Sequence, residues 1–118
     1  VNVKYDSFDS ALRNAPFMVE ARALSVETVD SKVLNLARED IVWHSVSELI
    51  TDVPDQEMLG LNIVEFAGDD EALIDERVNA LCARLDELIA SHQAGVIGWQ
   101  VCRELAGGWS AWQCQRCR

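Results

Sequence analysis

The sequence predicts a mainly α, compact single-domain protein built around one long amphipathic helix, with a small α+β fold as the alternative. The chain has 118 residues, a length that suits one domain over residues 1–118. Hydrophobic residues make up 49% of it and charged residues 25%, which is a globular composition. It contains only two prolines and six glycines. Scarce helix breakers favour long helices over many short strands.

The clearest expected element is a helix over residues 70–93. Apolar residues recur there at spacings of four, three, four and three, which is one stripe of a helix: Ile74, Val78, Leu81, Leu85 and Leu88. Acidic side chains stand at its start, where the helix dipole favours negative charge. Because a fully exposed stripe would be costly, these five residues predict self-association into a homodimer.

The N-terminal part is expected to form two short helices. Asp6 can cap the first, which runs through Leu12. Pro16 suits the first position of a second helix that runs through about Leu24. Residues 17–23 also alternate between apolar and polar, so a strand is an open alternative there.

Two further helices are expected, over residues 31–50 after a cap at Asp30 or Ser31, and over residues 96–105. In the second range apolar residues recur every four positions and Gly107-Gly108 follows. Residues 41–43 and 61–66 also have the continuous apolar character of buried strands. These two runs are the reason that an α+β fold is kept as the alternative.

The charge is unevenly distributed. The net charge is −10, and residues 39–76 hold twelve acidic residues with no lysine or arginine. Binding of a phosphate backbone needs clustered basic residues, so direct nucleic-acid binding is not expected. A surface of one sign can instead attract a basic protein partner or imitate a phosphate backbone.

No pattern of catalytic, cofactor-binding or metal-binding residues stands out, so the chain is expected to be non-enzymatic. Cys114 and Cys117 form the only CxxC motif, and His44 and His92 are not at zinc-ligand spacing. No glycine-rich phosphate loop is present. No cofactor or metal is therefore predicted, although a small CxxC redox or metal-binding protein remains an alternative.

A cytoplasmic location is expected. No stretch approaches the ~20 apolar residues that a membrane span needs. The first residues do not resemble a secretory signal. The four cysteines do not have the number or spacing of a disulfide framework, so a reducing compartment is the default interpretation.

The tryptophans are the strongest functional signal. Trp109 and Trp112 follow a Gly-Gly break near the end of the chain, and Trp43 follows Ile41 and Val42. Tryptophan is enriched in binding hot spots because it buries a large area with few torsions to immobilise. These five residues are predicted to bind a protein partner.

The segments 98–105 and 112–114 resemble part of a known family. With the size and composition of the chain, they are similar to small proteobacterial quorum-sensing antiactivators that bind LuxR-type regulators. The resemblance includes no diagnostic motif. It implies a homodimer that occupies the dimerisation surface of a transcriptional regulator and prevents DNA binding.

The sequence therefore predicts a protein-binding inhibitor or antiactivator. The acidic charge leaves an acidic nucleic-acid mimic or toxin-immunity inhibitor as one alternative. The CxxC motif leaves a small redox or metal-binding protein as another.

Overall fold

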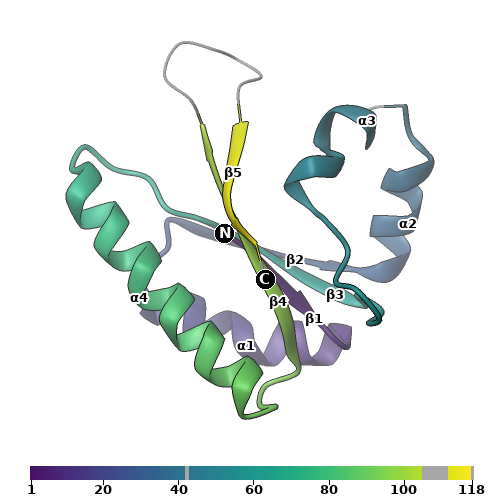
Figure 1. Cartoon of the computed structure of the whole chain (residues 1–118), viewed down its shortest axis with the longest axis horizontal. Coiled ribbons are helices and arrows are strands. Elements are labelled where there is room, and N and C mark those ends of the chain that lie inside the picture. Colours follow the sequence, from purple (N-terminus) through teal and green to yellow (C-terminus); the bar gives the residue numbers. More distant parts are fainter. Residues whose placement is uncertain (42, 105–111, 118) are drawn as a thin grey trace.

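A five-stranded antiparallel sheet forms the centre of the molecule (Figure 1). The computed structural model describes residues 1–41, 43–104 and 112–117. The strands are β1 (Asn2–Tyr5), β2 (Ser25–Asp30), β3 (Gly60–Glu65), β4 (Val96–Glu104) and β5 (Trp112–Cys117). Their order in the sheet is β2-β3-β1-β4-β5, and all neighbours are antiparallel.

Helices cover both faces of this sheet. They are α1 (Phe8–Glu20), α2 (Ser31–Glu39), α3 (Trp43–Val46), a 3₁₀ turn η1 (Ser47–Leu49) and α4 (Glu71–Ala90). Figure 1 shows α1 and α4 on one side of the sheet and α2 and α3 on the other. From β1 to β4, with α1 and α4 as the crossovers, the chain follows the β-α-β-β-α-β order of a ferredoxin-like fold. β5 extends the sheet beyond β4.

The prediction of a mainly α protein is therefore wrong, and the molecule is an α+β protein. The expected helix over residues 96–105 is the main error, because residues 96–104 form β4. This strand lies inside the sheet with Val96, Trp99, Gln100 and Val101 all buried. A strand covered on both faces has no clean alternation, and a register shift between Val101 and Cys102 disturbs the period further.

The N-terminal prediction is partly correct. One helix, α1, replaces the two that were expected, and Pro16 lies inside it. The helix is capped by Ser7 rather than Asp6, since the Ser7 hydroxyl accepts from Ser10 N at 3.0 Å. The buried positions Ala11, Asn14 and Met18 lie on one face of α1. Packing of that face on the sheet explains why one continuous helix forms despite the proline.

The other helix predictions are mixed. Asp30 caps α2 as expected, and its Oδ1 accepts from Val33 N at 2.9 Å. However, α2 ends at Glu39, and α3 and η1 follow it as separate short pieces. The long helix is confirmed as α4, which is capped by Asp70.

Two hydrophobic cores lie on opposite faces of the sheet. The larger core joins α1 and α4 to the sheet through residues that include Tyr5, Met18 and Leu85. The smaller core contains Leu34, Met58 and Leu61. Within the described part of the chain, no helix combines the length and the apolarity needed to cross a membrane.

Candidate functional site

A row of polar side chains fills part of the sheet face opposite α1 and α4. Lys4 is only 1% exposed, and its Nζ donates to Thr51 Oγ1 at 3.0 Å. The Oε1 of Gln100 accepts from Thr51 N at 3.0 Å, and its Nε2 donates to Glu48 O at 2.6 Å. Asn2 Nδ2 donates to Leu49 O at 2.6 Å. This polar row attaches the segment from η1 to Thr51 to the sheet.

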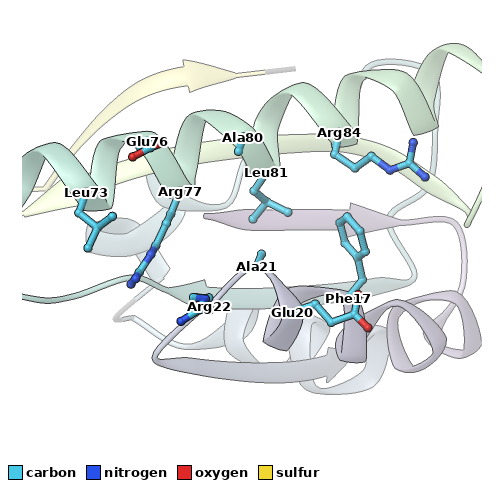
Figure 2. Close-up of a pocket in the computed structure, with 10 residues that line it drawn as sticks. All are labelled: Phe17, Glu20, Ala21, Arg22, Leu73, Glu76, Arg77, Ala80, Leu81 and Arg84. Carbon is cyan, nitrogen blue, oxygen red and sulfur yellow. The ribbon is translucent and has the colours of Figure 1, made fainter.

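The second notable feature is an open groove between the end of α1 and α4 (Figure 2). Its volume is about 590 Å³, within the ~300–1,000 Å³ of ordinary ligand sites. Apolar side chains from both helices line it: Phe17, Ala21, Leu73 and Leu81. Leu81 is buried in the core beneath, so the floor of the groove is part of the main packing of the domain.

Charged side chains surround this apolar floor. Figure 2 shows Arg77 extending from α4 toward Arg22, which follows α1. At the other end, Arg84 forms an ion pair with Glu87 at 2.8 Å. Glu20 and Glu76 also line the groove, but Figure 2 shows their carboxylates pointing away from Arg22 and Arg77. The two arginines therefore place positive charge at one end of an otherwise acidic protein.

Sequence reasoning did not identify this groove. Arg22 and Arg77 lie far apart in the chain and follow no motif. Only the packing of α1 beside α4 brings them to one place, so no local signal was available.

The structure separates the residues that were predicted to bind a partner. Ile41 is 84% exposed, whereas Trp43 is half-buried and its ring centre lies 5.7 Å from the guanidinium carbon of Arg38. Trp112 lies on β5. Val42 and Trp109 lie outside the described residues. The binding role of these five residues stays a prediction.

The residues predicted for self-association contribute to the chain's own core. Val78, Leu81, Leu85 and Leu88 are buried, and Ile74 packs against the same core at partial exposure. The apolar stripe of α4 is therefore covered by α1 and the sheet of one chain. Self-association through it stays a prediction.

The cysteine and histidine residues do not form a metal centre in the part of the chain that the structure describes. No group of three or more His, Cys, Asp or Glu side chains there could hold a metal ion. Cys82 is buried and Cys102 is partly buried, while Cys114 and Cys117 are placed by backbone pairing of β5 with β4.

The fold and sequence define a class of protein. Residues 1–116 match the family model described as FAD linked oxidases, C-terminal domain. Because this match covers almost the whole chain, the chain belongs to that family.

Three relatives share one name, D-2-hydroxyglutarate dehydrogenase. The protein of Pantoea ananatis is 75% identical over 107 residues, which is 91% of this chain and 10% of the relative. That of Haemophilus influenzae is 64% identical over 105 residues, 89% of this chain and 10% of the relative. That of Pseudomonas putida is 51% identical over 95 residues, 80% of this chain and 9% of the relative. The chain thus spans about a tenth of the length of these relatives, and no solved structure matches it.

These findings overturn the functional prediction from sequence. The chain is not a quorum-sensing antiactivator, because it belongs to the family of FAD linked oxidases and its relatives are named D-2-hydroxyglutarate dehydrogenase. The non-enzymatic assignment and the regulator partner are wrong for the same reason. The alternative predictions are also wrong: a nucleic-acid mimic, a toxin-immunity inhibitor and a small CxxC redox or metal-binding protein. The resemblance failed because it depended on size, composition and a tail without a specific motif.

The described residues do not fit the phosphate end of FAD. A dinucleotide pyrophosphate binds free amides at a helix N-terminus after a glycine-rich turn. Here one first-turn amide of each of the three longer helices already donates to its cap residue, which is Ser7, Asp30 or Asp70. Carboxylates at these ends, including Asp9 and Glu71 in the first turns, would repel a pyrophosphate.

Proposed function

We propose that this chain is part of an FAD-linked enzyme that oxidises D-2-hydroxyglutarate. The observation that carries the proposal is the 75% identity to a D-2-hydroxyglutarate dehydrogenase over 91% of the chain. Identity at this level extends through the strands and helices of both cores, so it supports a shared domain and a shared role for it. Membership in the flavin-linked oxidase family supports the same class of reaction.

Within such an enzyme, the chain would act as a scaffold rather than as the phosphate-binding part. Its helix N-termini are capped by their own side chains, as described above, and do not suit FAD. The polar row of Lys4, Thr51 and Gln100 has its hydrogen bonds directed into the segment that covers the sheet. We therefore assign flavin binding to parts of the enzyme outside the described residues.

The activity can be tested on the protein that carries this chain. D-2-hydroxyglutarate should reduce an artificial electron acceptor in the presence of the purified flavoprotein, and the L-enantiomer should not. A flavin-loaded preparation that gives no turnover with D-2-hydroxyglutarate would contradict the substrate. Turnover of another D-2-hydroxy acid in that preparation would retain the enzyme class and change the substrate.

We also propose that residues 1–118 belong to one domain in the cytoplasm. The single sheet with a core on each face supports one folding unit. The four cysteines lack the number and spacing of a disulfide framework, which suits a reducing compartment. Limited proteolysis should leave one resistant fragment that contains β1 to β5, and cell fractionation should place the protein in the cytoplasm. Early cleavage inside a core helix would contradict the first point, and recovery outside the cytoplasm would contradict the second.

A further inference from the structure

Arg22 and Arg77 form a convergent pair at one end of the α1–α4 groove. Figure 2 shows the Arg77 side chain reaching from α4 toward Arg22. Among the described residues, neither guanidinium has an ion pair, whereas Arg13, Arg38, Arg84 and Arg103 each pair with a carboxylate. Two like charges that face one another repel, and an anion placed between them would relieve the repulsion.

The backbone at Arg22 determines where its side chain lies. Arg22 has φ of 67°, in the left-handed region that a side chain with Cβ adopts at a cost. The position directly follows the C-cap of α1, where glycine is the usual residue. The same left-handed geometry follows α4, where His92 has φ of 53°, so it is the way in which both helices end. The left-handed turn carries the Arg22 side chain to the groove instead of continuing α1.

The remaining lining defines the chemistry of the ligand. A guanidinium binds a carboxylate through paired N–H donors. Phe17, Ala21 and Leu81 beside the arginines offer apolar contact to a hydrocarbon body. Glu20 and Glu76 at the edges disfavour a second negative charge on the ligand. The groove therefore suits a singly charged group with an apolar tail.

We propose that this groove binds an aliphatic monocarboxylate, with Arg22 and Arg77 holding the carboxylate and Phe17 and Leu81 contacting the chain. Nothing in the proposed dehydrogenase function requires such a site. Failure of the carboxylate proposal would therefore leave the dehydrogenase proposal unchanged, and the reverse also holds.

The test is equilibrium dialysis of the intact protein against radiolabelled hexanoate. Excess D-2-hydroxyglutarate is added so that a substrate site does not contribute to the signal. Hexanoate should bind saturably. Three other compounds should compete poorly: acetate has no apolar tail, 1-hexanol has no charge, and inorganic phosphate carries more than one negative charge. Absence of saturable binding, or equal competition by 1-hexanol, would overturn the proposal.

Variants locate the site. Arg22→Gly and Arg77→Ala should each weaken hexanoate binding about tenfold, the effect of losing one charge-assisted contact. Glycine also suits the left-handed backbone at this position, so the thermal midpoint of Arg22→Gly should not fall. A loss of binding in this variant would then not result from unfolding.

Two matched controls separate charge and backbone effects. Arg13→Ala removes an exposed arginine of α1 that pairs with Asp9, and Ala94→Gly relaxes another left-handed position without changing charge. Both should bind hexanoate as the parent protein does. Unchanged affinity in Arg22→Gly and Arg77→Ala would place hexanoate elsewhere and overturn the assignment.

Discussion

The indole Nε1 of Trp99 donates a hydrogen bond of 2.8 Å to Asp86 Oδ1 and thereby joins β4 to α4. Trp99 is 3% exposed and belongs to the larger core. A buried indole N–H needs a partner, and here the partner is a carboxylate on the helix that covers the strand. This contact joins α4, which sequence periodicity predicted, to β4, which was predicted as a helix.

Asp86→Ala should destabilise the chain by about 1–3 kcal/mol, because it leaves the Trp99 N–H buried without this acceptor. Urea unfolding followed by circular dichroism measures the change. Glu87→Ala is the control, since Glu87 pairs only at the surface with Arg84. Its effect should stay within about 0.5 kcal/mol. Equal losses of unfolding free energy in the two variants would show that the hydrogen bond from the indole does not stabilise the fold more than a surface ion pair.

Tyr5 should resist ionisation until the protein unfolds. It is the only tyrosine in the chain, so tyrosinate absorbance reports it alone. Burial raises the pKa of Tyr5 well above its ordinary value of 10.0, and the hydrogen bond from Asn62 offsets this only partly. Above pH 10.0 the unfolded chain binds fewer protons than the folded one, so the free energy of unfolding falls as pH rises. Below that pH, Tyr5 adds no pH dependence.

The measurement is an alkaline titration followed by tyrosinate absorbance and by circular dichroism together. The two signals should change in one transition. Tyrosinate formation near the ordinary pKa with circular dichroism unchanged would contradict a buried, hydrogen-bonded Tyr5.

Gly60→Ala should destabilise the chain, while Gly68→Ala should not. A Cβ at Gly60 would lie 2.5 Å from Ser7 O, a backbone atom at the start of α1. Relief requires α1 to shift from the sheet, at a cost of about 1–3 kcal/mol. At Gly68 the nearest atom is Ile74 Cδ1 at 3.8 Å, an ordinary contact. Thermal unfolding of both variants checks the difference, and equal midpoints would refute the close approach of α1 to β3.

Gln100→Leu should release the segment from η1 to Thr51 from the sheet. The change removes the acceptor for Thr51 N and the donor to Glu48 O. A loss of about 2–3 kcal/mol is expected from buried groups left without these partners. Hydrogen exchange at residues 47–51 should accelerate, whereas exchange in α4 should change less. Equal acceleration of exchange in both regions would contradict the assignment.

Local patterns predicted the parts of the fold that local energetics control. The helix α4 was predicted because its apolar residues keep helical spacing over several turns and acidic residues stand at its start. The cap of α2 at Asp30 was found for the same reason. β1, with four residues buried throughout, and β4, buried on both faces, carry no such periodic signal.

The candidate site was beyond sequence reasoning for a related reason. Trp43, Trp109 and Trp112 were predicted to bind a partner because large aromatic side chains are frequent in binding hot spots, and that role stays a prediction. Trp43 packs with Arg38. Arg22 and Arg77 looked like ordinary surface charges, since nothing in their neighbours in sequence distinguishes them from Arg13. Their significance depends on where α1 ends relative to α4.

By itself, the sequence determined the acidic character of the protein, the long helix and the cap of α2, because composition, periodicity and capping act within a few residues. Only the tertiary structure decided that residues 96–104 form a strand, that two cores lie on opposite faces of one sheet, and that Arg22 and Arg77 share a groove. These features arise from pairing and packing between distant segments, and their free energy appears only when the segments meet.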